Sequence, residues 1–251
     1  MYFIDDGNYD KNLFIFGEDV ETKFGVIRFL TYREYLTNLP ELSLITQNSL
    51  HIYYHYKKLI PSDNAEMLSS LLEIKEAPLL ELVLNSEEML KAYLKIFQLV
   101  FDKSSNRAFD DVFRDNDNFM FVRNLIMDMN ALTEEKVSPN EEIQKAFERS
   151  RRVKQRDSEE LSFVDIVTSI VASTNHTFEQ VCNMTVFQVY AIYSRIGAIF
   201  NYQTTTLFAT VAEKVNIESW NKHIDLFKTE KDALTRKEFD KKFGGLLGKQ
   251  S

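Results

Sequence analysis

The stretch NSEEMLKAYLKIFQLVF, residues 85–101, decides the fold class. Asn85 or Ser86 can cap a helix at this point, because a side-chain oxygen there accepts a hydrogen bond from an unpaired backbone N–H of the first turn. Apolar residues then recur every three or four positions and share one broad helical face. They are Met89, Leu90, Tyr93, Leu94, Ile96, Phe97 and Val100. The stretch predicts an amphipathic helix packed against a core, and FMFVRNLIMDMNAL (119–132) repeats the pattern.

The composition of the whole chain extends this prediction. Its 251 residues suffice for one large domain or two small ones with a buried core. Aromatic residues make up 13% of the chain, whereas it has only 7 Gly and 4 Pro. Few turn-forming residues favour helices joined by short loops, and they argue against a β-sandwich or barrel, which needs frequent turns.

Signals for helix starts and stops occur along most of the chain. Helices are predicted from Thr31 to about Leu39, from Leu44 to Ile60, from Asn64 to about Glu76, and from Thr185 to at least Phe200. Two short helices, SWNKHIDLF (219–227) and TRKEFDKKF (235–243), are expected to follow. Capping-box spacing supports several of these starts. The pairs are Thr31 with Glu34, Ser162 with Asp165, Thr177 with Gln180, Thr185 with Gln188, and Thr235 with Glu238.

Strand-like sequence is confined to the beginning of the chain. NLFIF (12–16) and GVIRFLT (25–31) are rich in aromatic and β-branched residues, and the polar GEDVETKF between them suggests a hairpin. We therefore predict a mainly α protein, in which a small N-terminal β-hairpin precedes a helical domain and a C-terminal helical bundle. The predicted parts are residues 1–132, a charged linker with an exposed helix at 133–160, and residues 161–251.

The net charge and the start of the chain argue against several classes of protein. The net charge is −8, which disfavours general nucleic-acid binding because that requires net positive surface. The acidic start MYFIDDGNYD and the lack of an apolar run of about 18 residues argue against a signal peptide and a membrane span. The lone Cys182 cannot form an internal disulfide. We expect the protein to act in a cytoplasm without contacting a membrane.

The histidines His51 and His55, within SLHIYYHYKKLI (49–60), are the strongest candidate for a metal site. Two imidazoles four residues apart share a helical face and could supply two zinc ligands. A zincin helix would carry Glu after the first His, where this sequence has Ile52. A core helix packed through Leu50, Tyr53, Tyr54 and Leu59 is the simpler interpretation, so no metal or cofactor is predicted.

A basic run is the second candidate. RSRRVKQR (149–156) carries Arg149, Arg151, Arg152, Lys154 and Arg156, which could contact phosphates or an acidic partner. Between residues 141 and 160, however, six acidic residues balance six basic ones. A solvated helix with pairs of opposite charge within it is the ordinary interpretation.

Signatures of enzymatic chemistry are absent from the sequence. It has no G-x-x-x-x-G-K-[ST], G-x-G-x-x-G, G-x-S-x-G or C-x-x-C motif. No catalytic residue is predicted, and binding or assembly becomes the expected role.

Three stretches resemble proteins of the tail-morphogenesis gene clusters of long-tailed phages of Gram-positive bacteria. They are GVIRFLTYREYLTNLPELSLI (25–45), MTVFQVYAIYSRIGAIFNYQTTTLFATV (184–211) and KVNIESWNKHIDLFKTEKDALTRKEFDKKFGGLLG (214–248). The second is similar to the core helix of phage tail assembly chaperones. Together they cover about half of the chain, and they carry apolar–polar patterns rather than catalytic signatures.

The resemblance implies a non-enzymatic chaperone that binds the tape-measure or tail-tube protein in the host cytoplasm during morphogenesis. Aromatic anchors for that partner would be Phe187, Tyr190, Tyr193 and Trp220. A structural virion component of the neck, tail or baseplate is an alternative, and self-association stays open. Two further alternatives are a nucleic-acid-associated regulator that uses residues 149–156 and a metalloenzyme that uses His51 and His55.

Overall fold

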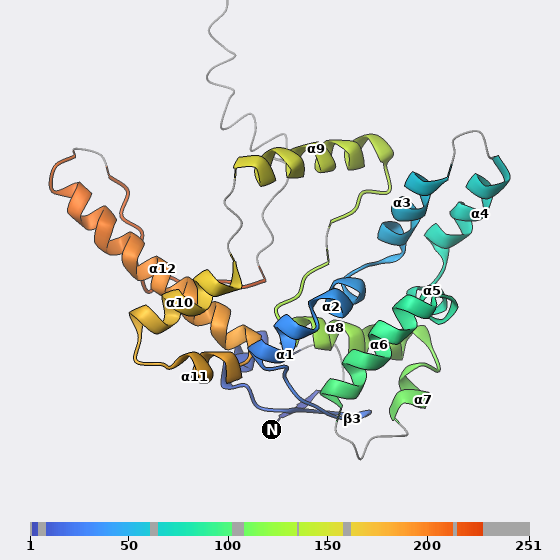
Figure 1. The fold of residues 1–251 in the computed structure, drawn as a ribbon, viewed down its shortest axis with the longest axis horizontal. Coiled ribbons are helices and arrows are strands. Elements are labelled where there is room, and N and C mark those ends of the chain that lie inside the picture. Colours follow the sequence, from blue (N-terminus) through green and yellow to red (C-terminus); the bar gives the residue numbers. More distant parts are fainter. Residues whose placement is uncertain are drawn as a thin grey trace, which may run out of the picture. The chain divides into compact units, whose positions relative to one another are not determined.

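The fold is mostly helical with a small N-terminal sheet, as predicted (Figure 1). It is known from a computed structural model that describes residues 2–4, 9–60, 65–101, 108–134, 136–157, 162–212 and 215–227. The chain divides into two compact units. The first comprises Met1–Val137 and Leu161–Phe227, and the second comprises Ser138–Glu160 and Lys228–Ser251.

The N-terminal sheet has three short strands, β1 (Tyr2–Ile4), β2 (Val20–Thr22) and β3 (Gly25–Ile27). β2 pairs with β3 antiparallel, with Val20 opposite Ile27, and β1 joins the other edge of β2 in parallel. The predicted strand at 12–16 is wrong, because Lys11–Phe16 forms a 3₁₀ helix, η1. The side chain of Asp10 accepts a hydrogen bond from the backbone N–H of Asn12, and Gly17, at φ 65°, donates to the carbonyl of Phe14 and closes the turn.

Two short helices follow the sheet, α1 (Tyr32–Thr37) and α2 (Leu39–Ile45). The capping box between Thr31 and Glu34 is confirmed. The helix predicted from Thr31 to about Leu39 is divided, however: α1 ends at Thr37, and Pro40 lies in the first turn of α2, where a missing N–H costs no hydrogen bond. The predicted helix 44–60 is likewise divided: α2 ends at Ile45, and α3 (Ser49–Leu59) begins after its own cap, Asn48.

The next helices are α4 (Ala65–Glu76), α5 (Leu79–Asn85), α6 (Glu87–Val100), α7 (Ala108–Val112) and α8 (Asn116–Met129). α3 packs along α4 (Figure 1), and α6 contacts α2 and α5. The amphipathic helix predicted within 85–101 is confirmed as α6, with Ser86 as its cap. α8 starts before the amphipathic stretch predicted at 119–132, and the side chain of Asp115 caps it.

The larger of two hydrophobic clusters lies among the sheet, η1 and helices α2 to α8. Aromatic rings dominate it: Phe14 packs edge-on against Phe29 at 5.4 Å, and Tyr93 and Phe119 have centroids 4.9 Å apart. Rings at this spacing add about 0.5–1.5 kcal/mol per pair to their hydrophobic burial. The cluster therefore holds the N-terminal helices at fixed positions.

The smaller cluster lies among α10 (Phe163–Ser173), α11 (Phe178–Asn183), α12 (Val186–Ala209) and α1. The predicted capping boxes that begin at Ser162, Thr177 and Thr185 are all confirmed. Tyr32 of α1 is 1% exposed in this cluster, and its backbone N–H donates to the carbonyl of Met184 at 2.8 Å. One N-terminal helix thus supplies part of the C-terminal core.

The segment 215–227 forms turns and irregular chain, so the predicted helix at 219–227 is wrong. Its apolar residues Leu226 and Phe227 are half-buried against the larger cluster, which gives the segment tertiary contacts in place of helical hydrogen bonds. The predicted helix at 235–243, its capping box at Thr235 and the glycines after it lie outside the described residues.

In the second unit, α9 (Glu141–Asp157) confirms the helix predicted after Pro139. The side chain of Asn140 accepts hydrogen bonds from the backbone N–H groups of Glu142 and Ile143, which satisfies two donors of its first turn. Within the described chain, no helix is both long enough and apolar enough to cross a membrane.

Candidate partner-binding surfaces

A buried arginine sets the position of helix α3. Arg123 of α8 is fully buried, and its guanidinium donates to the carbonyls of Ile45 and Gln47 at 2.9 and 3.1 Å. It also donates to the Tyr93 hydroxyl at 3.0 Å and to a carboxylate oxygen of Glu134 at 2.5 Å. A buried cation is tolerated only when it is paired and hydrogen-bonded, and these contacts meet that requirement. We call these five residues the Arg123 network.

The Arg123 network extends directly to the start of α3. The second carboxylate oxygen of Glu134 accepts a hydrogen bond from the side-chain amide of Asn48 at 3.2 Å, and Asn48 in turn caps α3. Burial raises the pKa of Tyr93 to about 12, so its hydroxyl stays neutral and donates to the Ile45 carbonyl at 3.4 Å. The loop between α2 and α3 is therefore held from three sides, and α3 leaves it in a fixed direction.

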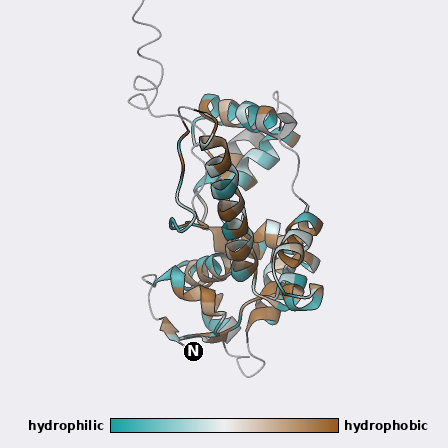
Figure 2. Cartoon of the chain, turned by 90° about the vertical axis from the view of Figure 1, so that its left-hand side faces the viewer, coloured by the Kyte–Doolittle hydropathy of each residue, from teal (hydrophilic) through white to brown (hydrophobic). Residues whose placement is uncertain are grey.

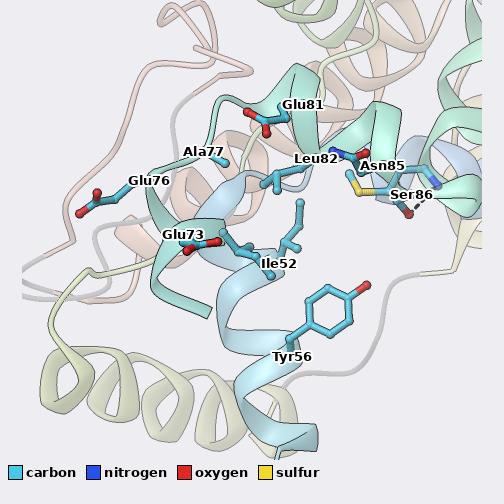
Figure 3. Close-up of a pocket in the computed structure, with 11 residues that line it drawn as sticks. Ile52, Tyr56, Glu73, Glu76, Ala77, Glu81, Leu82, Asn85 and Ser86 are labelled. Carbon is cyan, nitrogen blue, oxygen red and sulfur yellow. Dashed lines mark hydrogen bonds between the residues drawn. The ribbon is translucent and has the colours of Figure 1, made fainter. Parts of the chain in front are cut away.

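Helix α3 forms one wall of a pocket of about 550 Å³. The other walls come from α4, α5 and the beginning of α6 (Figure 3). The lining residues are Ile52, Tyr56, Glu73, Ile74, Glu76, Ala77, Glu81, Leu82, Asn85, Ser86 and Met89. Ser49 helps to hold these walls together, since its hydroxyl donates to the carbonyl of Ala77 at 3.0 Å. We call this cavity the acidic pocket.

The lining of the acidic pocket is apolar inside and acidic at the rim. Ile52 and Met89 are 7% and 6% exposed, whereas Glu73, Glu76 and Glu81 are exposed. Among the described residues, the lining contains no Lys, Arg or His. Two lysines of the neighbouring helices, Lys57 and Lys75, lie 5.6 and 5.8 Å from the ring centre of Tyr53, outside the lining.

Helix α12 changes character along its length. Its first turns are buried in the core, with Val186 and Val189 at 0% exposure. Beyond Gly197, Ile199 is half-buried, but three large apolar side chains are exposed: Phe200 by 54%, Leu207 by 71% and Phe208 by 62%. Figure 2, which faces the left-hand side of Figure 1, shows α12 largely in brown, the colour of hydrophobic residues. We call residues 198–209 the exposed half of α12.

The segment 215–227 packs against the first half of α12. Arg195 donates hydrogen bonds to the carbonyls of Trp220 and Lys222, the second at 3.0 Å. The ring of Phe227 lies 5.9 Å from that of Phe187, and the ammonium of Lys11 lies 4.5 Å from the centre of the Phe227 ring. A second pocket, of about 620 Å³, lies between this segment, η1 and α12, and its lining carries both acidic and basic groups.

The structure places the four predicted aromatic anchors in different surroundings. Phe187 is only 7% exposed and packs edge-on against Phe14 at 6.1 Å. Tyr190 and Tyr193 are half-buried at the smaller cluster, where Tyr190 contacts Tyr32. Trp220 is 47% exposed. Of these four side chains, Trp220 presents the most surface to a partner, and the partner-binding role of the set stays a prediction.

The basic run 149–156 lies entirely on α9. Arg149 and Arg152 are exposed and Arg151 is half-buried, whereas the side chains of Lys154 and Arg156 lie outside the described part of the chain. A contact of this run with phosphates or an acidic partner stays a prediction.

The two histidines of α3 have different environments. His51 closes a capping box with Asn48: its backbone N–H donates to the Asn48 side-chain oxygen at 3.1 Å, and its Nδ1 accepts from the Asn48 backbone N–H at 3.5 Å. His55 is exposed, and its ring stacks edge-on with Tyr56 at 5.7 Å. Ile52 and Tyr53 are buried as a core helix requires, but Leu59, predicted to pack, is 66% exposed. Among the described residues, no three His, Cys, Asp or Glu side chains gather where they could hold a metal ion.

The sequence contained a signal for the Arg123 network but none for the acidic pocket. Arg123 stands within FMFVRNLIMDM, where a cation between apolar residues on an inward face needs a buried partner. The carboxylates of the pocket, by contrast, come from two helices and follow no spacing rule, so only the tertiary structure brings them together.

Comparison with known proteins identifies the family. The model of the YomV N-terminal domain matches residues 9–139, and that of the YomV second domain matches residues 154–225. The chain is 31% identical over 239 residues to an SPbeta prophage-derived uncharacterized protein, YomV, of Bacillus subtilis (strain 168). The match covers 94% of this chain and 98% of that protein, which supports a phage origin. No solved structure matches the chain. These similarities extend over nearly the whole chain, and the protein therefore belongs to the YomV family.

Proposed function

We propose that this protein is a non-enzymatic phage assembly factor that binds a helical protein of the phage tail in the host cytoplasm. The tape-measure protein and the tail-tube protein are the candidate partners, as the resemblance to tail assembly chaperones implies. The prophage origin of the Bacillus subtilis relative supports a phage-associated role. The single observation that carries the binding role is the exposed half of α12.

An exposed apolar helix is costly unless another surface covers it. Leu207 and Phe208 are 71% and 62% exposed, and Val211, just beyond the helix, is 82% exposed. Burial of such side chains contributes roughly 1.5–3 kcal/mol each when a partner removes them from water. Large apolar residues grouped on a helix are typical of sites where another protein binds.

The first turns of helix α12 are anchored in the core, so the helix can present its exposed half to a partner. The capping box at Thr185 and the buried residues Val186 and Val189 anchor its first turns. Hydroxyls of Thr205 and Thr206 donate to backbone carbonyls one turn earlier, at 2.7 and 2.8 Å, so these polar groups are satisfied within the helix. The exposed half can therefore bind a partner without unfolding of the core.

The test is a pulldown of the tagged full-length chain during phage production, with mass spectrometry of the eluate and of the finished particles. We expect tape-measure or tail-tube protein in the eluate and no copy of this chain in the particles. Stoichiometric presence in particles would refute the chaperone role and indicate a structural virion component. Recovery of nucleic acid alone would refute protein binding and favour a role for the basic run 149–156.

A paired substitution tests the surface itself. Leu207→Gln together with Phe208→Gln should abolish capture of the tail protein. The matched control is Phe163→Gln with Val164→Gln, which removes apolar side chains of similar exposure, 53% and 50%, from α10. Equal capture by both variants and the parent chain would exclude the exposed half of α12 as the binding surface.

A further inference from the structure

We propose that the acidic pocket binds a lysine or arginine side chain of a basic amphipathic helix in the partner protein. This inference rests on the proposed function, and it adds the chemical character of the partner. The partner would then contact two surfaces of this protein: the exposed half of α12, and the acidic pocket built by α3, α4, α5 and α6.

The shape of the pocket suits a long side chain with an apolar stem. Its volume of about 550 Å³ lies within the range of roughly 300–1,000 Å³ that is usual for ligand pockets. Ile52, Leu82 and Met89 supply apolar walls. Lysine and arginine bury their methylene stems against such walls and keep the charged end near water.

The charge at the rim suits a cation. Glu73 on α4 and Glu81 on α5 reach the pocket from two helices, and Figure 3 shows Glu73 beside Ile52. Neither these two carboxylates nor that of Glu76 makes an ion pair with a residue in the described part of the chain. A cation bound at this rim can therefore form ion pairs with carboxylates that have no charged partner in the described part of the chain.

Two further groups can contact the same cation. Tyr56 is 43% exposed at the pocket, and the face of a tyrosine ring attracts an ammonium or guanidinium group. The side-chain carbonyl of Asn85, on α5, can accept a hydrogen bond from it. An anionic ligand would find no basic group in the part of the lining that the structure describes, and a purely apolar one would leave the acidic rim without a partner.

The surroundings of the pocket favour a helix over a small organic cation. Leu72 lies one turn before Glu76 on α4, and Leu84 lies one turn after Glu81 on α5. These leucines are 55% and 49% exposed. Residues three or four apart share a helical face, so apolar side chains flank the acidic rim on both helices. A basic amphipathic helix offers lysines for the rim and leucines for its flanks.

The direct test measures fluorescence anisotropy of a labelled amphipathic helical peptide built from Ala, Leu and Lys, titrated with the full chain. A second peptide carries Glu in place of every Lys. We expect saturable binding of the Lys peptide, weakened by salt, and no binding of the Glu peptide. Glu73→Gln with Glu81→Gln removes two partly exposed ion pairs, each of which contributes up to about fivefold in affinity. Together the two substitutions should weaken binding of the Lys peptide roughly tenfold.

The matched control is Glu21→Gln with Glu179→Gln, which removes the same charge from exposed sites outside the pocket. Equal weakening by the two variants would overturn the proposal, because the attraction would then come from net charge alone. Competition by spermidine at the affinity of the Lys peptide would also overturn it, since the pocket would then be a site for small polyamines. Circular dichroism of each variant checks that the helices are retained.

The two proposals can fail separately. If the pocket variant still captures the tail protein at parent level in the phage pulldown, the pocket inference fails and the assembly role stands. If the Lys peptide binds through the pocket while no tail protein is captured, the assembly role fails and the pocket remains a site for cationic side chains.

Discussion

Replacement of the buried arginine, Arg123→Met, is expected to destabilise the protein strongly. Met occupies much of the same volume, so the change removes hydrogen-bond donors and charge more than packing. The guanidinium donates to the carbonyls of Ile45 and Gln47, to Tyr93 and to Glu134. In the variant, the two carbonyls lose their charged donor in the protein interior.

The expected loss follows from these contacts. A buried polar group without a partner costs about 1–3 kcal/mol. The Gln47 carbonyl loses the Arg123 donor, whereas the Ile45 carbonyl keeps only the longer hydrogen bond of 3.4 Å from the Tyr93 hydroxyl. The released carboxylate of Glu134, 36% exposed, can regain part of its hydration. We therefore expect a loss of about 3–5 kcal/mol, the range found when one member of a buried ion pair is removed. Proteins of ordinary stability have about 5–15 kcal/mol, so the variant should still fold.

Urea unfolding followed by circular dichroism measures this loss. The midpoint should fall by about 1–2 M, with an unchanged slope. The matched control is Arg114→Met, because Arg114 forms a surface pair with Asp111 at 3.1 Å, with side chains 73% and 52% exposed. That variant should stay within about 0.5 kcal/mol of the parent. Equal midpoints for the two variants would refute the view that the Arg123 network holds the α2–α3 loop.

Four further outcomes follow from local geometry. Gly17→Ala should destabilise by about 1–2 kcal/mol in urea unfolding, because φ is 65° and the added Cβ would lie 3.1 Å from side-chain atoms of Gln188 in α12 and of its cap, Thr185. Gly197→Ala should instead stabilise by up to about 1 kcal/mol, since the site is helical and nothing lies within 4 Å of the added Cβ; a loss of stability there would contradict this reasoning. Phe14→Leu should cost about 1–3 kcal/mol by loss of ring contacts at a fully buried site, and no change in the midpoint would show that the core repacks freely. Arg28 donates two hydrogen bonds of 2.8 Å to the Glu34 carboxylate and lowers its pKa to about 2. The melting temperature of the parent should therefore exceed that of Glu34→Gln by a constant amount above about pH 4.5, and the difference should vanish toward pH 2. A difference in melting temperature that is independent of pH would refute the linkage.

Local rules predicted the helical elements well, because their signals lie within single segments. The capping boxes at Thr31, Thr177 and Thr185 require only residues three apart, and each is present. The apolar face of α6 required only helical periodicity. The predictions failed where a tertiary contact or an adjacent turn decided the conformation. NLFIF became a 3₁₀ helix through Asp10 and Gly17, and residues 219–227 pack as turns.

The sites were less predictable than the elements. The aromatic anchors were chosen by residue type, yet Phe187 is a core residue because Phe14 and Phe227, distant in sequence, enclose it. The acidic pocket combines side chains from four consecutive helices. Its position depends on the angles between those helices, which packing in the core determines and periodicity does not encode.

The contact of Tyr32 with Met184 and the bridge between Thr31 and Thr185 have a consequence for the order of folding. These pairs join residues about 150 positions apart, and closure of so long a loop is entropically unfavourable until both ends are structured. During synthesis, α1 leaves the ribosome long before α11 and α12 exist. The C-terminal helices therefore complete their core on an N-terminal template, and a nascent chain arrested before residue 184 should leave Tyr32 accessible to solvent.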